Sequence, residues 1–226
     1  MKKLYFICLL FSYIGIAQNV TITKVIETGC GTPFVKTVEL FVDGTVDFST
    51  DVVLNYMNNG QPWAANQIDI SALGVQTDAF VYIVRDIPLM EAEFPSTTFN
   101  ASNTVVVGDA TNGDDGYQIV LNGVVVSQFG ETEVDGTGTG WEHVDAVATR
   151  KDCLPDIGTF DITHWDFTPL QSTDSQTACE GGAGLEAWFT TLGATFPLGS
   201  GSGWTPTGNV CTTALTTDAV ACESFT

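Results

Sequence analysis

The sequence has few positive charges. Seven of its 226 residues are lysine or arginine, against 27 aspartates and glutamates, which gives a net charge of −20. Nucleic-acid-binding proteins need clustered cations to displace counterions from phosphates, and anionic lipid headgroups attract basic segments for the same reason. The composition therefore argues against nucleic acid and anionic membranes as partners, and it leaves cations, neutral sugars and basic proteins open.

Residues with catalytic chemistry are also scarce. His143 and His164 are the two histidines, and the chain contains neither a Cys-x-x-Cys pair nor a Gly-x-Ser-x-Gly elbow. Nucleophilic catalysis of the Ser-His or Cys-His kind needs an imidazole beside the nucleophile, and zinc needs clustered cysteine and histidine ligands. We therefore expect no zinc site and no enzyme activity. Paired carboxylates for hydrolysis stay open, since 27 acids offer many pairs.

Long apolar runs are missing after the N-terminus. Lys2 and Lys3 precede an apolar run over residues 4–16, and small residues at Gly15 and Ala17 suit cleavage before Gln18. This pattern predicts a signal peptide over residues 1–17, and hence a secreted or cell-surface protein. No later run is long enough for a membrane helix, so we expect no membrane insertion after cleavage.

Five cysteines follow the predicted signal peptide. In an exported protein they are candidates for disulfides. Their spacing does not determine which of them pair, and their odd number leaves at least one unpaired in a monomer. The candidates are Cys30, Cys153, Cys179, Cys211 and Cys222.

Short β-strands separated by turn dipeptides dominate the rest of the chain. Asn122-Gly123 lies between two apolar runs and predicts a hairpin over residues 117–129. Asp43-Gly44 predicts a second hairpin over residues 38–48 in the same way. Further strands are expected at residues 20–26, 52–57, 79–85 and 104–108. This pattern is typical of a sandwich or barrel, and the fold class is mostly β.

Helical signals are few. Pro88 opens a predicted helix that ends at Phe94, and a second short helix is expected near residues 184–193, with Gly193 as its cap. The segment 171–226 is rich in glycine, serine and threonine, so we interpret it as a C-terminal extension of a β domain over residues 18–170.

An ordered set of motifs in this domain resembles the lamin tail domain, in the secreted form found in exported proteins of Bacteroidetes-like bacteria. The motifs are Thr37-Val38-Glu39-Leu40-Phe41-Val42, Val46-Asp47-Phe48-Ser49, residues 81–84 and 89–94, Asn112-Gly113-Asp114-Asp115, Leu121-Asn122-Gly123-Val124-Val125-Val126, Phe129-Gly130, Gly138-Thr139-Gly140-Trp141, Asp145, Arg150, Phe160-Asp161 and Trp165. The resemblance implies an immunoglobulin-like β-sandwich, often placed beside hydrolase or nuclease domains. It does not fix a function.

Two groups of residues are candidate ligand sites. Asp109, Asp114 and Asp115 lie in one loop, where carboxylates could hold calcium or instead form the turn. The rings of Trp141 and Trp165, and also Trp63, could stack on sugars or instead pack in the core. The glycines before Trp141 are expected to form a wide loop over its ring.

These features favour a secreted, non-catalytic module for adhesion, protein contact or scaffolding, with an unidentified protein or glycan partner. The alternative is a carbohydrate-binding or calcium-assisted accessory domain of an extracellular hydrolase system. A metal-dependent hydrolase is a third possibility. No cofactor other than calcium is implied by these residues.

Overall fold

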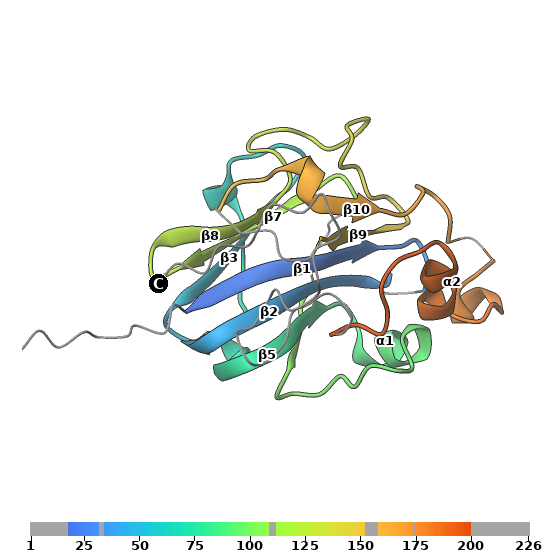
Figure 1. The fold of residues 1–226 in the computed structure, drawn as a ribbon, viewed down its shortest axis with the longest axis horizontal. Helices are drawn as coiled ribbons and strands as arrows, with labels where there is room; N and C mark the ends of the chain where they lie inside the picture. Colours follow the sequence, from blue (N-terminus) through green and yellow to red (C-terminus); the bar gives the residue numbers. More distant parts are fainter. Residues whose placement is uncertain (1–17, 32–33, 109–111, 152–157, 174, 200–226) are drawn as a thin grey trace, which may run out of the picture.

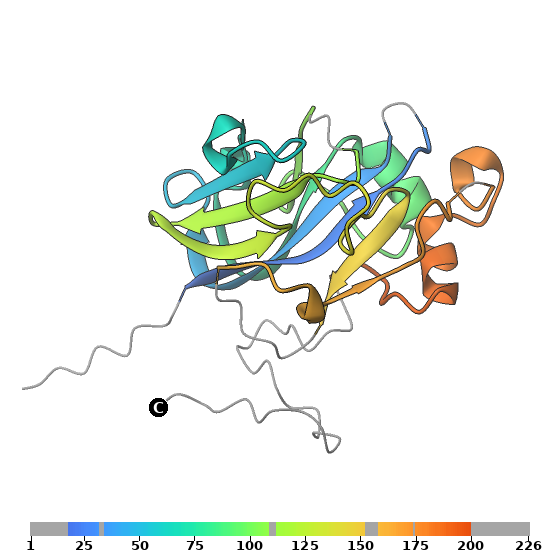
Figure 2. The ribbon, with the colours of Figure 1, turned by 90° about the horizontal axis from the view of Figure 1, so that it is seen from above.

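The fold is mostly β. The structure is a computed structural model that describes residues 18–31, 34–108, 112–151, 158–173 and 175–199. Its strands form one six-stranded and one four-stranded sheet, which lie against each other as two layers (Figures 1 and 2). This arrangement confirms the mostly β fold class expected from the turn pattern.

The larger sheet has the order β10-β9-β1-β2-β5-β6. Neighbouring strands are antiparallel except for β5 and β6, which are parallel. Its strands are β1 (Asn19–Glu27), β2 (Lys36–Asp47), β5 (Val75–Val84), β6 (Thr104–Val106), β9 (Ala146–Arg150) and β10 (Trp165–Phe167).

The smaller sheet has the order β4-β3-β7-β8 and is antiparallel throughout. It consists of β3 (Val52–Met57), β4 (Gln67–Ile68), β7 (Gly116–Leu121) and β8 (Val124–Phe129). The predicted hairpin at Asn122-Gly123 is confirmed as β7–β8. Asn122 and Gly123 have φ angles of 51° and 79°, the positive values that a tight two-residue hairpin turn requires.

The second predicted hairpin is wrong. The chain does not turn back at Asp43-Gly44, because β2 continues through this dipeptide to Asp47. Instead, the register against β5 shifts between Val42 and Thr45, which marks a β-bulge. Gly44 has a φ of 73°, and its N–H donates to Asp78 Oδ1 at 2.8 Å. Gly44 supplies a positive φ, which a β-bulge can require just as a tight turn does.

The main core lies between the two sheets and contains an aromatic cluster around Phe129, at the end of β8. The ring of Phe129 lies 4.7 Å from that of Trp165, 5.0 Å from His143, 5.8 Å from Phe160 and 6.0 Å from Trp141. Edge-to-face pairs of this kind add to the burial of large apolar surfaces. They attach the long connections after β8 to the sandwich.

A second core lies under the two α-helices, on the outer face of the larger sheet. Both helices were predicted: α1 (Ile87–Glu93) begins at Asp86, which accepts the N–H of Leu89, and α2 (Leu185–Thr191) is followed by Gly193 with a φ of 89°. The buried members of this core are Ile26, Val35, Tyr82, Val84, Met90, Phe94, Phe99, Val147, Leu185, Phe189 and Leu198. Residues 185–198 are therefore packed onto the β domain.

Short 3-10 helices complete the described chain. They are η1 (Trp63–Ala65), η2 (Ser71–Leu73), η3 (Ile162–His164) and η4 (Ala178–Glu180). In the part of the chain that the structure describes, each helix is too short or too polar to cross a bilayer.

Replacing Phe129 with alanine should lower the free energy of unfolding by about 3–5 kcal/mol, because the fully buried ring leaves a cavity among several aromatic partners. Urea unfolding measures this change. Val124→Ala on the same strand is the control, since that side chain is 63% exposed, and it should change stability by less than about 0.5 kcal/mol. Equal effects of the two substitutions would contradict the assigned core.

Candidate functional site

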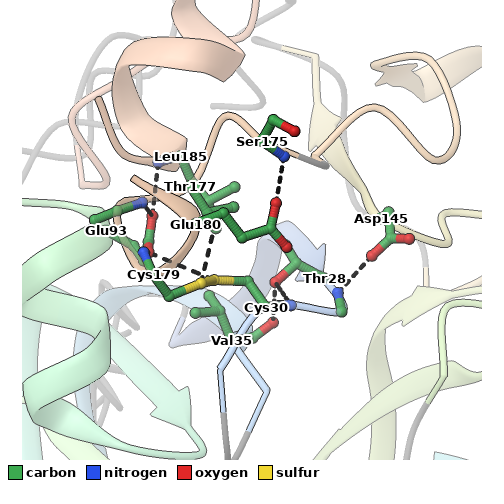
Figure 3. The surroundings of a disulfide bond; sticks show 12 residues. Thr28, Cys30, Val35, Glu93, Asp145, Ser175, Thr177, Cys179, Glu180 and Leu185 are labelled. Atoms are coloured by element: carbon green, nitrogen blue, oxygen red, sulfur yellow. Dashed lines mark hydrogen bonds between the residues drawn. A yellow bond between two sulfur atoms is a disulfide. The ribbon is translucent and has the colours of Figure 1, made fainter. Parts of the chain in front are cut away.

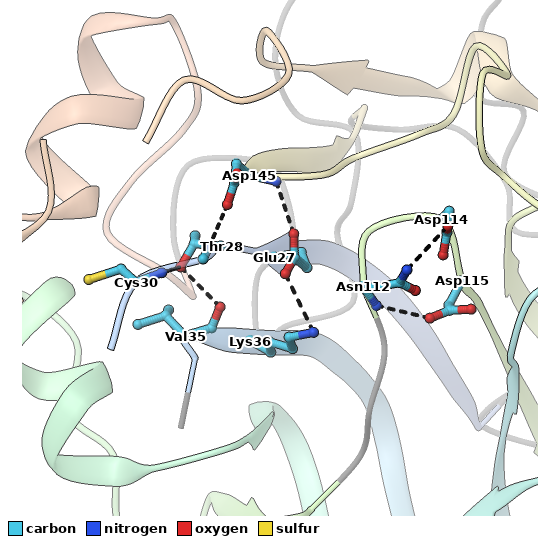
Figure 4. A network of polar contacts seen from close by, with 10 residues as sticks. Glu27, Thr28, Cys30, Val35, Lys36, Asn112, Asp114, Asp115 and Asp145 are labelled. Carbon is cyan, nitrogen blue, oxygen red and sulfur yellow. Dashed lines mark hydrogen bonds and ion pairs between the residues drawn. The ribbon is translucent and has the colours of Figure 1, made fainter. Parts of the chain in front are cut away.

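Polar side chains gather at the end of the sandwich where β1 ends and β2 begins (Figure 4). Lys36 Nζ lies 3.4 Å from Glu27 Oε1, and both side chains are less than a tenth exposed. The backbone N–H of Asp145 donates to Glu27 Oε2 at 2.9 Å, and the Asp145 carboxylate accepts the N–H of Gly29. Burial raises the pKa of Glu27, while the Asp145 N–H and Lys36 oppose that rise.

The aspartate loop lies next to this network. Asp115 is fully buried, and its two oxygens accept the backbone N–H groups of Asn59 at 2.8 Å and of Asn112 at 3.0 Å. Asp114 Oδ2 accepts the hydroxyl of Thr137 at 2.9 Å, and the Asn112 amide lies 3.3 Å away. Burial raises the pKa of Asp115. These contacts fit a turn-forming role for both carboxylates.

The calcium expectation for this loop stays a prediction. The structure brings Asp114 and Asp115 together, but Asp109 lies outside the described residues. Hard cations bind through carboxylate oxygens on a loop that can bend around them. Here both oxygens of Asp115 are already held by backbone donors.

A disulfide joins Cys30, which follows β1, to Cys179 in η4 (Figure 3). The two Cα atoms are 6.4 Å apart, and 149 positions separate the residues in sequence. Of the five candidate cysteines the structure pairs these two, whereas Cys153, Cys211 and Cys222 lie outside the described residues. The bond attaches the predicted C-terminal extension to the β domain.

Glu93 reinforces this attachment and was not identified from the sequence. Its carboxylate is fully buried and accepts three backbone N–H groups, from Ala178 at 3.1 Å, Cys179 at 3.1 Å and Leu185 at 2.9 Å (Figure 3). Ligand atoms of Cys30, Glu93 and Cys179 lie within 4.8 Å of one another, as a metal site would require. With the sulfurs joined, no thiolate is left to bind a metal. We call the Cys30–Cys179 disulfide and the Glu93 carboxylate together the clasp.

A buried ion pair crosses from β1 to β2. Lys24 Nζ lies 2.9 Å from Glu39 Oε1, and neither side chain has any exposed surface. Glu39 also accepts the hydroxyl of Thr23 at 2.8 Å and the N–H of Gly199 at 2.6 Å. Burial, and secondly the charge of Glu39, raise the pKa of Tyr82. This ion pair was not identified from the sequence, because its burial depends on contacts between residues that are far apart in the chain.

The two histidines lie in different environments, and neither is part of a strand. His143 is buried in the connection between β8 and β9, with its ring 5.0 Å from that of Phe129 and Nδ1 3.3 Å from the carbonyl of Trp141. Burial lowers its pKa to about 4. His164 ends η3, where Nε2 lies 3.7 Å from Asp161 Oδ2. Asp161 already accepts the N–H and hydroxyl of Thr163.

Two of the three tryptophans named as sugar-stacking candidates, Trp141 and Trp165, do not lie on the surface. Trp141 is fully buried and Trp165 is 3% exposed, so the sugar-binding interpretation of these two does not fit this structure. A Cβ atom on Gly136 would lie 2.7 Å from the Trp141 ring, so glycine is needed for the loop to pack over that ring, as expected. Trp63 differs from both, because it is partly exposed.

A shallow hollow of about 80 Å³ lies between β9–β10 and the residues after α2. It is lined by Val147, Thr149, Asp166, Phe167, Thr168 and residues 192–195. This volume suits a few water molecules rather than a drug-sized ligand.

No family model matches the chain, and neither a curated protein nor a solved structure matches it. The fold and the clasp together define a mostly β protein of two sheets with a disulfide-fastened helical segment.

Replacing Cys179 with serine should lower the free energy of unfolding by about 2–5 kcal/mol, because the cross-link closes a long loop. Hydrogen exchange should also become faster across residues 175–199. Glu93→Gln should speed exchange in the same segment, since it removes the charge that the three N–H groups bind. Glu91→Gln, on the exposed side of α1, is the control. Unchanged exchange in both clasp variants would contradict this role.

His143 should make stability depend on pH. Below pH 6.5 the unfolded chain takes up a proton that the folded imidazole does not accept until about pH 4. Its contribution is therefore present above pH 6.5 and is lost as the pH falls to about 4, on the order of 3 kcal/mol. Glu27 and Asp115, with raised pKa values, oppose this loss.

Urea unfolding of the wild type and His143→Asn from pH 7 to pH 4 isolates this contribution, because the two acids are present in both proteins. The wild type should lose more stability than the variant over this range. An NMR titration of His143 with a midpoint near 6.5 would contradict the prediction.

Proposed function

We propose that this chain is a secreted, non-catalytic binding or structural module, with an immunoglobulin-like sandwich of the lamin tail type. It would serve extracellular adhesion, protein contact or scaffolding. The main support is that four buried charged side chains, near the end of the sandwich where β1 ends and β2 begins, are held by contacts within the fold. Glu27, Glu93 and Asp115 each accept backbone N–H groups, and Lys36 is paired with Glu27.

A carboxylate acting as an acid or base must meet its substrate within hydrogen-bond reach. The raised pKa values of Glu27 and Asp115 arise chiefly from burial inside the fold. Shifts of this kind also occur in structural networks. The environment of these groups therefore supports a structural role better than a catalytic one.

Three further observations support the remainder of the proposal. The two-sheet architecture and the β7–β8 hairpin agree with the architecture that the lamin tail resemblance implies. The Cys30–Cys179 disulfide is compatible with an oxidising, extracellular location. The strongly acidic composition keeps an extracellular surface solvated and disfavours non-specific association.

If the proposal is correct, a bacterial host expressing the full chain should export it, with Gln18 as the new N-terminus and Cys30 and Cys179 joined. N-terminal sequencing and peptide mapping without reductant measure both outcomes. Residues 18–226 expressed without the leader are the control and should stay in the cytoplasm. Retention of the full chain in the cytoplasm with free thiols would refute the secreted part.

The non-catalytic part is tested on the exported protein with panels of phosphoesters and polysaccharides. We expect no product above the level of a matched sample denatured by heat. Turnover that disappears when a single carboxylate is replaced by its amide would refute this part.

A further inference from the structure

One stretch of the chain at an edge of the molecule has no charged side chain. Residues 52–68 contain no aspartate, glutamate, lysine or arginine, although the whole chain carries a net charge of −20. Amide side chains take their place at Asn55, Asn58, Asn59, Gln61, Asn66 and Gln67, together with Tyr56 and Trp63. In the structure this stretch forms β3, η1 and β4, at one edge of the smaller sheet.

A row of amides crosses the outer face of this sheet. Asn55 Nδ2 donates to Gln118 Oε1 at 3.2 Å, and Gln118 Nε2 donates to Gln128 Oε1 at 3.1 Å. Strand pairing places Asn55 opposite Gln118 on one side and Gln67 on the other, while Gln118 pairs with Gln128. The row therefore spans all four strands, and its hydrogen bonds run in one direction from Asn55 towards Gln128.

The row ends by fixing Trp63. Gln128 Nε2 donates to Thr132 Oγ1 at 3.2 Å, and the same hydroxyl accepts the indole N–H of Trp63 at 3.1 Å. The ring passes so close to Gly116 that a Cβ there would lie 2.8 Å from Trp63 Cη2. The ring is thus held in one orientation while part of it stays exposed.

At its other end the row has a buried acceptor without a donor. Asn55 is 7% exposed, and its Oδ1 has no hydrogen-bond partner. On β4 the residue paired with Asn55 is Gln67, which is exposed. An unsatisfied buried acceptor costs about 1–3 kcal/mol, so this end of the row lowers the stability of the fold.

We infer that a neutral oligosaccharide binds here, on the exposed or partly exposed residues Gln61, Trp63, Asn66 and Gln67, which we call the amide ribbon. This inference rests on the proposed binding function and names its ligand class. An amide both donates and accepts, so it matches neighbouring sugar hydroxyls. The face of a fixed indole supplies a rigid apolar surface for the C–H face of a pyranose ring.

Charge selects between neutral and anionic sugars. An anionic glycan would be repelled by the net charge of −20 and by the exposed Glu131 and Glu133, which flank the Thr132 that binds Trp63. A neutral polyhydroxyl ligand is indifferent to this field and complements the amides.

Affinity electrophoresis of the oxidised protein tests the inference in native gels containing mixed-linkage β-glucan, xyloglucan, galactomannan or starch, with alginate as the anionic comparison. We expect at least one neutral polysaccharide to retard the protein, and alginate not to. Trp63→Ala should weaken retardation at least tenfold, and the double variant Gln61→Ala/Gln67→Ala severalfold. Trp188→Ala, a partly exposed tryptophan on α2, is the matched control and should migrate like the wild type.

Unfolding curves establish that each variant folds. If Trp63→Ala does not fold, the double variant is used alone. It should fold, because Gln61 and Gln67 are exposed. Absence of retardation in all four neutral polysaccharides would overturn the inference, as would equal retardation by alginate or retardation unchanged in the ribbon variants. Release of reducing sugars from the same polysaccharides would instead refute the non-catalytic function, so the two failures are distinguishable.

Discussion

The structure depends on the apolar layer between its two sheets, and on Phe129 within it. This ring lies where β8 leaves the smaller sheet, and its partners come from segments that follow β8 along the chain. Their burial brings the connection after β8 back across the sandwich and leads into β9, which pairs with β1. The position of Asp145 beside Glu27 follows from this packing.

The buried charged side chains add specific contacts to this apolar packing. Lys24 and Glu39 lie on neighbouring strands of the larger sheet, and Glu39 also holds the N–H of Gly199. Glu93 does the same for three N–H groups around the disulfide. A buried carboxylate is stabilised by backbone donors, and the donors gain a partner in return. In both places an acid of the β domain fixes the segment that follows β10, which is how that segment becomes part of the fold.

Charge is distributed unevenly around the smaller sheet. β3, η1 and β4 carry amides and no charged side chain, while the acidic loop after β8 lies beside them and binds Trp63 through Thr132. The amide row beneath Trp63 costs conformational freedom and leaves one acceptor unsatisfied, so it is not explained by stability alone.

Local signals in the sequence determined those elements whose cause lies within a few residues. Asn122-Gly123 fixed one hairpin through its positive φ angles, Pro88 marked the start of the first helix, and Gly193 marked the end of the second. The predicted strands at residues 20–26 and 52–57 also appear, as β1 and β3. In each case the pattern of apolar residues and turn formers is complete inside the segment itself.

Tertiary structure decided what depends on distant partners. Asp43-Gly44 became a bulge because β1 and β5 pair on either side of β2 and hold it extended. Cys30 and Cys179 are 149 residues apart in the chain, and their pairing depends on the second core, which α1 and α2 share. The burial of Trp141, and the exposure of Trp63, likewise follow from which surfaces meet. These features depend on how much apolar surface is buried, and how many polar groups are paired, in the whole molecule. A short stretch of sequence does not contain this information.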